Sequence, residues 1–447
     1  MSSGKSSFGK RVVGNTFYSL ADLFLTKIST TIVFIILVRV LPDSDIAAIG
    51  VAMGYLVFIS YMDVAPIRVL MRDYPKISKD KIKRDELLTA LFCFWLFQSI
   101  LMLSVCAILN KFVLNQLGIP GVEFLFFAMT VDFIALSIQG WLKLVYYTDF
   151  RQRTATYISF LFTILRLVSY GVLFVKPSLI TYSWILIVIG SIACIVWATV
   201  FTLHFNYRPL FDRNTPKILV NSLKDYGLWD HFNRTIVDTL FVVDIIILSS
   251  VGYLSDVANY TVALKFTSLL AIIPAQLSHG LQVMLSNYDS TEKKYAAMDS
   301  FIKFNALISV AQLSFILIFG GWLIRLLFGA DTDQDVITYS IVVASGVTIF
   351  NFGFPFMSIV NNYCNIREAF ITVFLPCLFA GIFIYYQFAD LWGALGVAYG
   401  NIVSYSLLTI SLIVFTMRKY PYRFKFQWVS SSEKNLFQEL LRKGKVK

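Results

Sequence analysis

The sequence predicts an all-α polytopic membrane protein with about twelve transmembrane helices. The chain has 447 residues, of which 57% are hydrophobic and only 15% are charged, whereas soluble domains carry about 25% charged residues. A helix needs roughly 20 apolar residues to cross the hydrocarbon core of a bilayer, and runs of that length recur along the whole chain. Because the cations fall in short connections between these runs, the net charge of +11 does not indicate nucleic-acid binding.

Twelve apolar segments, taken in order, are long enough to span a bilayer. The first follows a basic N-terminus and is too long for the core of a signal peptide, so we expect it to be retained. Each later segment ends at a turn or at a charged connection. The predicted spans are 13–41, 45–71, 86–110, 121–147, 153–175, 179–205, 219–251, 256–287, 297–328, 334–362, 367–388 and 392–417.

The connections between these spans alternate in charge. The odd-numbered connections hold few cations, whereas the even-numbered ones are basic, as in Arg72–Arg84 and Arg151–Arg153. The positive-inside rule places basic connections in the cytoplasm. We therefore expect both termini to be cytoplasmic.

A short internal repeat divides the chain into two halves. Residues 44–55 align with residues 255–266 at an offset of 211 residues, which corresponds to six spans. An even number of spans gives both halves the same orientation, related by a pseudo-two-fold axis along the membrane normal. The sequence thus predicts two six-helix lobes with a cleft between them. The predicted divisions are a cytoplasmic N-terminus (1–12), an N-terminal lobe (13–205), a cytoplasmic inter-lobe linker (206–218), a C-terminal lobe (219–417) and a basic cytoplasmic tail (418–447).

The seventh span carries charges at helical spacing. Asp230, Arg234 and Asp238 follow i, i+4, i+8 and share one helix face. Asp238 lies roughly 20 Å from the turn near Val251, close to mid-membrane. An ionised residue there costs about 2.5 to 3.5 kcal/mol, so it normally faces a partner or water. Two interpretations remain, a self-neutralising ladder that packs helices and a hydrated substrate path; similar charges in other spans favour the path.

Two spans of the first half carry charges at mid-membrane depth. Lys27 lies near the midplane of the first span, beside a polar stripe that includes Asp22. Asp132 and Arg166 are each 17 residues from Asp149, the expected hairpin turn. Because these two residues lie at the same depth on neighbouring helices, we expect a salt bridge between them.

Two further positions complete the set of intramembrane charges. Asp244 and Lys265 lie at similar depths across the first hairpin of the second half, where a pair is plausible. Arg68 lies nearly a full span from the outer end of its helix, so it either snorkels or acts as a cytoplasmic gate.

These charges suggest two kinds of chemistry. Cations in the membrane suit a phosphate or pyrophosphate group, and carboxylates could bind a proton or Na⁺ that drives transport. The five cysteines and three histidines show no metal-ligand spacing, so we expect no cofactor other than a coupling ion. The candidate substrate-binding residues are Lys27, Arg166, Arg234 and Lys265, and the candidate ion-coupling residues are Asp22, Asp238 and Asp244.

Four motifs along residues 12–418 carry a family resemblance. Arg39–Asp45 is similar to the family's turn after the first helix, although no glycine precedes Pro42. Val257–Lys265 is similar to the entry to the eighth helix, with Ala258 in place of glycine. Leu327–Gly329 and Trp392–Ala398 are similar to the turn after the ninth helix and to the start of the last one. The chain resembles the polysaccharide-exporter and lipid-linked oligosaccharide flippase branch of the multidrug/oligosaccharidyl-lipid/polysaccharide exporter superfamily.

The resemblance implies two six-helix bundles, alternating access and a bacterial plasma-membrane location. It implies a polyprenyl-pyrophosphate-linked oligosaccharide as cargo, destined for cell-surface polysaccharide, with membrane lipids and glycan polymerases as partners. Three other functions stay open: a small-molecule or drug antiporter of the same fold, a membrane glycan polymerase, and a non-transporting scaffold. An enzyme is disfavoured because the longest outer connection, Lys111–Pro120, holds no carboxylate or histidine.

Overall fold

The structure, a computed structural model, is predominantly helical in the described part of the chain. It describes residues 18, 22, 25–64, 74–78, 80–149, 151–211, 217, 220, 228–251, 254–287, 290–330 and 332–421, and none of these residues forms a strand. The chain divides into two compact units, Met1–Thr235 and Ile236–Lys447. The predicted boundaries of the lobes remain predictions, because part of the expected linker lies outside the described residues.

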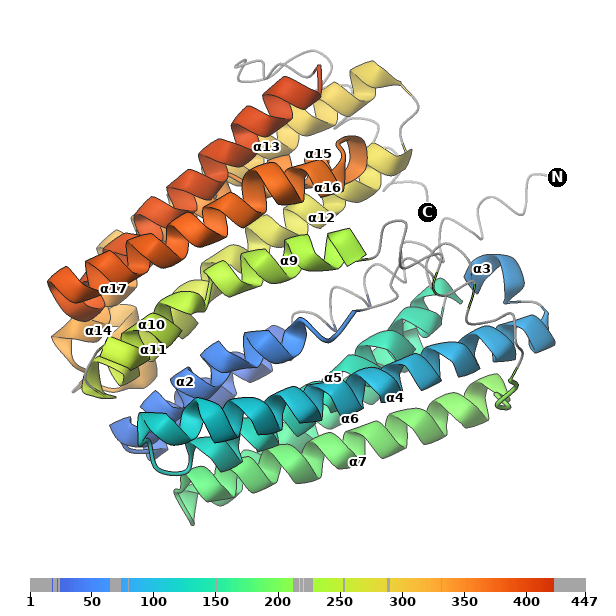
Figure 1. The fold of residues 1–447 in the computed structure, drawn as a ribbon, viewed down its shortest axis with the longest axis horizontal. Coiled ribbons are helices and arrows are strands. Elements are labelled where there is room, and N and C mark those ends of the chain that lie inside the picture. The colour runs from blue at the N-terminus through green and yellow to red at the C-terminus, as the bar shows by residue number, and fades with distance from the viewer. Residues whose placement is uncertain are drawn as a thin grey trace. The chain divides into compact units, whose positions relative to one another are not determined.

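The described part of unit 1 contains five helices of 18 residues or more, α2, α4, α5, α6 and α7, together with shorter elements. Figure 1 shows their arrangement. A first helix occupies the described residues 25–40. The 3₁₀-helices Leu114–Leu117 and Tyr170–Phe174 follow α4 and α6. The labelled helices are α2 (Asp43–Ser60), α3 (Tyr74–Ile77), α4 (Lys81–Phe112), α5 (Val122–Thr148), α6 (Gln152–Ser169) and α7 (Leu179–Phe205).

Unit 2 begins within α9 (Leu228–Leu240). A π-helical turn, Phe370–Phe374, joins α16 to α17 in the predicted eleventh span of the chain. The other helices are α10 (Val243–Val251), α11 (Leu254–Ser268), α12 (Ile272–Asn287), α13 (Thr291–Phe328), α14 (Gln334–Asn351), α15 (Phe354–Tyr363), α16 (Ile366–Ala369) and α17 (Leu375–Lys419). A 3₁₀-turn, Leu269–Ala271, joins α11 to α12.

The described helices fit the predicted twelve spans. Nine of them are long and apolar enough to cross a membrane, and the last of these, Ile366–Lys419, contains two spans joined at a kink. The kink falls at Trp392 and Gly393, and Gly393 has a φ of 57°, a conformation that glycine adopts without steric cost. The first helix and the α9–α10 segment supply the remaining two spans. The all-α polytopic fold is therefore confirmed.

Helix starts reproduce the internal repeat. Helices α2, α4 and α5 begin at Asp43, Lys81 and Val122, and α11, α13 and α14 begin about 211 residues later in each case. The repeat detected in one short motif therefore extends over several consecutive helices.

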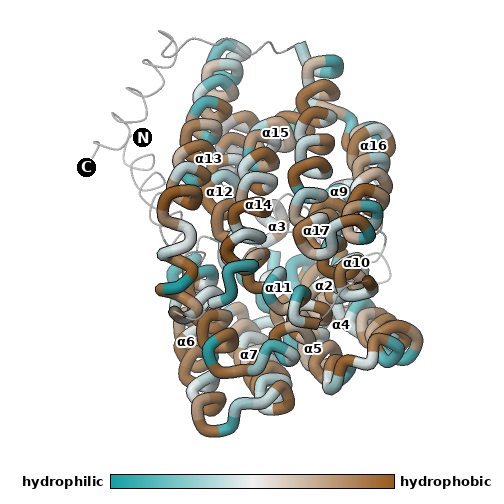
Figure 2. The backbone as a smooth tube through the Cα atoms, turned by 90° about the vertical axis from the view of Figure 1, so that its left-hand side faces the viewer, coloured by the Kyte–Doolittle hydropathy of each residue, from teal (hydrophilic) through white to brown (hydrophobic). Residues whose placement is uncertain are grey.

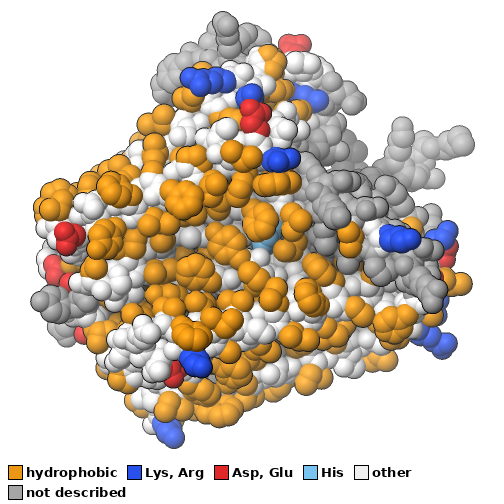
Figure 3. Space-filling view, in the orientation of Figure 1, with side chains coloured by type: hydrophobic (Ala, Val, Ile, Leu, Met, Phe, Trp, Pro, Cys, Tyr) orange, Lys and Arg blue, Asp and Glu red, His pale blue; other side chains and the backbone are white. Residues whose placement is uncertain are grey.

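The helix surfaces are suited to lipid. Apolar residues dominate the long helices, and the hydrophilic ones lie mostly near their ends (Figure 2). Hydrophobic side chains also cover most of the described surface in Figure 3. In the spans formed by α6 and α13, only 22% of the most apolar 18-residue stretch is buried within the protein. The side chains of Leu161 and Ile195 are more than 60% exposed. Exposed apolar area on this scale needs a hydrocarbon environment.

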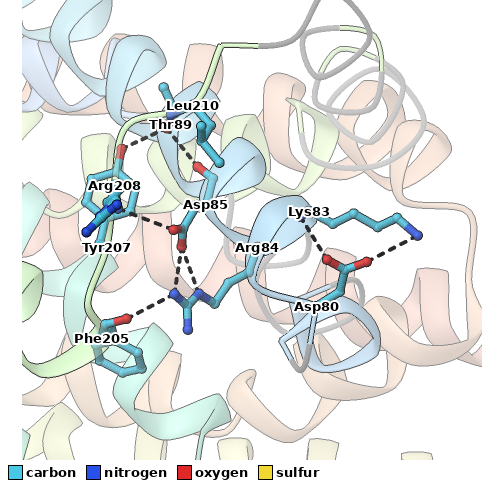
Figure 4. A network of polar contacts seen from close by, with 9 residues as sticks. All are labelled: Asp80, Lys83, Arg84, Asp85, Thr89, Phe205, Tyr207, Arg208 and Leu210. Carbon is cyan, nitrogen blue, oxygen red and sulfur yellow. Dashed lines mark hydrogen bonds and ion pairs between the residues drawn. The ribbon is translucent and has the colours of Figure 1, made fainter.

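A polar network fixes the start of α4 to the segment that follows α7 (Figure 4). The fully buried Asp85 carboxylate accepts hydrogen bonds from Arg84 Nη2 (2.7 Å) and from the Arg208 backbone N–H (3.3 Å). Arg84 Nη2 also donates to the Phe205 carbonyl oxygen (2.9 Å). The Thr89 hydroxyl contacts Tyr207 Oη (2.8 Å). The chain leaving α7 is thus held against α4.

Several predicted spans differ from continuous helices: the second ends at Ser60, and the tenth is interrupted between α14 and α15. The difference in the seventh span bears on the candidate site. The seventh span, expected as a continuous helix over 219–251, is interrupted at Phe241 and Val242, between α9 and α10. Neither residue is a glycine or proline, so no helix-breaking residue in the sequence signals the interruption. The break creates free backbone groups that neighbouring side chains must satisfy.

Candidate functional site

A fully buried carboxylate lies at the break in the seventh span. Asp244, in the first turn of α10, is 0% exposed. Its Oδ2 accepts hydrogen bonds from the Tyr260 hydroxyl (2.7 Å) and from Asn401 Nδ2 (3.1 Å), and its Oδ1 accepts one from the Ile245 backbone N–H (2.7 Å). The partners come from three helices, α10, α11 and α17. We call Asp244, Tyr260, Asn401 and Tyr385 the buried polar cluster.

Tyr385 connects the buried polar cluster to the broken helix. Its hydroxyl donates to Asn401 Oδ1 (2.7 Å) and to the carbonyl oxygen of Leu240 (3.4 Å). Leu240 is the last residue of α9. The helices approach closely here, since a Cβ added to Gly346 would lie 3.1 Å from the Asn401 backbone. An interrupted helix inside a membrane is tolerated where tertiary contacts satisfy the freed groups. The buried polar cluster provides such contacts.

The expected Asp244–Lys265 pair is wrong. Among the described residues, all partners of Asp244 are uncharged, and Lys265 is half-buried elsewhere on α11. Equal depth did not bring the two side chains together, because Tyr260 and Asn401 fill the coordination of the carboxylate. A buried carboxylate without a cation is costly in its charged form. The site is therefore chemically suited to bind a proton or a monovalent cation.

Unit 1 holds Asp22 in an ion pair. Asp22 is 7% exposed, and its Oδ2 lies 2.9 Å from Lys143 Nζ of α5 and 3.3 Å from the Tyr147 hydroxyl. Lys143 also lies 6.0 Å from the centroid of the Trp197 ring. Asp22, an expected ion-coupling residue, thus has a cation as its neighbour, which sets it apart from Asp244.

The Asp132–Arg166 salt bridge is confirmed. Arg166 Nη2 of α6 contacts Asp132 Oδ1 of α5, and both residues are largely buried. A Cβ added to Gly190 on α7 would lie 3.0 Å from Asp132 Oδ1, so glycine leaves room for the carboxylate. Arg166 therefore occupies an internal pair, and it could bind a diphosphate only in competition with Asp132.

The other predicted site residues occupy varied environments. Lys27 is exposed, and its ammonium makes no hydrogen bond or ion pair with any described residue. Arg234 is exposed on α9 and lies within electrostatic reach of Asp63. Asp238 is exposed on the same helix. Arg68, the gate candidate, lies outside the described residues.

Several residues of these sites were not anticipated. Lys143 and Tyr147 lie near the end of a predicted span, where a cation can be taken for an interfacial residue. Asn401 and Tyr385 lie among other polar residues of the last two spans, such as Gln387 and Ser404, and no pattern in the sequence singles them out. Tyr260 belongs to the repeated motif at residues 255–266, whose periodicity alone does not indicate a buried hydroxyl.

A metal centre has no basis in the part of the chain that the structure describes. There, no three His, Cys, Asp or Glu side chains are grouped so that they could hold a metal ion. The five cysteines are all free thiols.

Sequence comparisons alone do not identify a family. No protein-family model matches the chain, and no curated protein matches its sequence.

Solved structures do resemble it. The lipid II flippase MurJ in an inward closed conformation superimposes with a TM-score of 0.68 and 14% identity, covering 96% of this chain and 92% of that one. An outward-facing multidrug resistance MATE family transporter of the MOP superfamily has a TM-score of 0.66 and 15% identity, covering 92% and 96%. A MOP superfamily transporter from Pyrococcus furiosus has a TM-score of 0.63 and 13% identity, covering 92% and 95%. At these identities the likeness establishes the fold, which is that of MOP superfamily transporters.

Proposed function

We propose that this protein is a flippase that moves a polyprenyl-pyrophosphate-linked oligosaccharide across the bacterial plasma membrane by alternating access. The fold shared with a lipid II flippase and the four sequence motifs support a transporter. The observation that carries the choice of an anionic cargo is Lys27, a cation inside the first span with no partner among the described residues. With a rise of 1.5 Å per residue, it lies roughly 21 Å from the end of the helix at Leu41.

An ammonium at this depth that has no partner in the described part of the chain needs a wet path or an anionic ligand. The cost of a charge within the bilayer is relieved by water, by a counter-charge or by snorkelling. A diphosphate offers several acceptor oxygens to a lysine. We assign Lys27 and Arg234 of unit 1 to the diphosphate. Arg166 and Lys265 remain secondary candidates for binding the diphosphate. Arg166 already pairs with Asp132.

We assign coupling to Asp244. A carboxylate held by neutral donors changes its net charge when a proton or Na⁺ binds, and this change acts directly on the break between α9 and α10. Interrupted helices that carry ion sites are a recurrent device in secondary transporters. Asp22 and Asp238 remain candidates for the same role, although the pairing of Asp22 with Lys143 neutralises it.

A small-molecule antiporter of the same fold is the second candidate. It is favoured by the likeness to multidrug MATE transporters and by a buried carboxylate suited to ion exchange. It is disfavoured by Lys27, a cation without a partner among the described residues, which repels cationic drugs. A glycan polymerase finds no support among the structures that resemble the chain, since those named above are transporters.

The sidedness of lipid-linked glycan in a deletion strain tests the proposal. A membrane-impermeant reagent should find full-length glycan-lipid trapped on the cytoplasmic leaflet, and re-expression of the protein should release it. Normal sidedness with short, unpolymerised glycan would favour the polymerase. Unchanged glycan together with a change in drug resistance would favour the antiporter.

A further inference from the structure

A polar cavity lies at the basic end of unit 1, beside the polar network at the start of α4. Its volume is about 270 Å³, and its lining includes Tyr74, Arg84, Asp149, Arg151 and His204. Four elements meet there: α3, the start of α4, and the ends of α5 and α7. The basic connections of the sequence leave the helices at this end, so the cavity lies at the level where spans reach the membrane surface.

Two guanidinium groups present unused donors to this cavity. Arg84 donates from Nε and Nη2 to Asp85 and Phe205, but its Nη1 has no partner in the described part of the chain. Arg151 Nε lies 2.8 Å from Asp149 Oδ2, and its guanidinium carbon lies 5.2 Å from the centroid of the Phe205 ring. Neither Nη of Arg151 makes a hydrogen bond or an ion pair with a described residue. Each arginine is therefore held in place by one carboxylate while its remaining N–H groups stay available.

Tyr74 adds a hydroxyl group to the lining of the cavity. The residue is 1% exposed and lines the cavity, yet its hydroxyl has no hydrogen-bond partner within the described residues. Burial, aided by the nearby Asp149 carboxylate, raises the pKa of Tyr74 well above its ordinary value. The hydroxyl therefore stays protonated at neutral pH and can donate. Such a hydroxyl is available to a hydrogen-bond acceptor that enters the cavity.

These donors converge on a small volume and match one chemical class. Arginine binds phosphate oxygens through parallel N–H groups, and a tyrosine hydroxyl adds a third donor. Drug-sized ligands occupy about 300 to 1,000 Å³, so this cavity is too small for an oligosaccharide but sufficient for a phosphate. We propose that the cavity binds the phosphate group of one anionic phospholipid from the adjacent leaflet, at a site separate from the transport path.

Lipid retention by the purified protein tests this proposal. Delipidated protein in detergent is incubated with phosphatidylglycerol or phosphatidylcholine, and bound lipid is counted by native mass spectrometry. We expect one phosphatidylglycerol to be retained in preference to phosphatidylcholine. Arg151→Gln should weaken this retention roughly tenfold, because a hydrogen bond to a charged group is lost. Tyr74→Phe, which preserves shape, should weaken it severalfold.

Arg153→Gln is the matched control. Arg153 is an exposed neighbour whose Nε donates to Tyr157 Oη (3.2 Å) and which does not line the cavity. It should retain lipid as the unmodified protein does. Equal retention by Arg151→Gln, Tyr74→Phe and Arg153→Gln would overturn the proposal. If millimolar inorganic phosphate raises the melting temperature of the unmodified protein but not of Arg151→Gln, while no lipid is retained, the phosphate chemistry holds and the lipid source is wrong.

Discussion

At the scale of single residues, charges within the helices fall into two groups. Asp22 and Asp132 each pair with a cation from a neighbouring helix. Asp244 instead has only neutral donors, and Lys27 has no partner among the described residues. Paired charges stabilise the arrangement of helices, whereas unpaired ones are available for ligands. We therefore expect substitutions in the two groups to have different consequences.

The Asp132–Arg166 pair should contribute to stability. Arg166→Met leaves a buried carboxylate without its partner, which should cost about 3–5 kcal/mol. Asp132→Asn combined with Arg166→Met should restore most of that loss, because no buried charge remains. Thermal unfolding of the purified variants in detergent measures both effects. A double variant as unstable as the sum of the single variants would contradict the pairing argument.

Asp244 should matter for transport rather than for folding. Asn at this position keeps the shape and an acceptor oxygen for Tyr260, so Asp244→Asn should fold, but it cannot exchange a proton or neutralise a cation. We expect transport to fall at least about tenfold, the loss that follows when one essential interaction of about 1.4 kcal/mol is removed. Asp390→Asn, at an exposed aspartate, is the control. Transport by Asp244→Asn at the unmodified rate would refute the coupling assignment.

The sequence predicted an ion pair correctly where the two residues lie at equal depth on the two helices of one hairpin, as Asp132 and Arg166 do. Asp132 and Arg166 flank one hairpin symmetrically, so their meeting followed from helix geometry. Asp22 and Lys143 come from helices far apart in the chain, and Asp244 meets Asn401 across an even longer interval. Such contacts depend on which helices pack together, and local periodicity does not contain that information.

At the scale of elements, glycines fix where the last two spans meet. Gly393 takes a positive φ at the kink, and a Cβ added to Gly396 would lie 1.9 Å from the Phe388 carbonyl oxygen. These residues belong to the motif at Trp392–Ala398, so its glycines have a steric explanation. The predicted turn at residues 389–391 was close to this kink.

Gly396→Ala should therefore destabilise the protein. The added methyl group must displace backbone, which should cost about 1–3 kcal/mol or more. Gly140→Ala is the matched control, because a Cβ there meets nothing within 4 Å. Thermal unfolding and the yield of monodisperse protein compare the two variants. If both variants unfold at the same temperature, the close contact between Gly396 and the Phe388 carbonyl oxygen does not limit the stability of the protein, and the prediction is wrong.

The break in the seventh span was not predictable in the same way. No glycine or proline lies at Phe241 and Val242, and a polar contact from Tyr385 on a distant helix satisfies the Leu240 carbonyl. The interruption is thus a tertiary effect.

At the scale of the whole molecule, hydropathy and the repeat carried most of the information. Apolar runs predicted the twelve spans, and one motif at an offset of 211 residues predicted the repeated order of helices that the helix starts reproduce. Cargo is a different matter, since transporters of this fold include a lipid II flippase and multidrug transporters. Only the chemistry of particular residues, Lys27 above all, separates these functions.

The most direct test is flipping by the purified protein in proteoliposomes. A polyprenyl-diphosphate oligosaccharide is placed in both leaflets, and an impermeant reagent follows its appearance outside. We predict that the unmodified protein and the control Lys176→Ala, at an exposed lysine, flip it, that Lys27→Arg retains activity, and that Lys27→Ala loses it while remaining folded. Equal flipping by Lys27→Ala, or no flipping by the unmodified protein, would contradict the account.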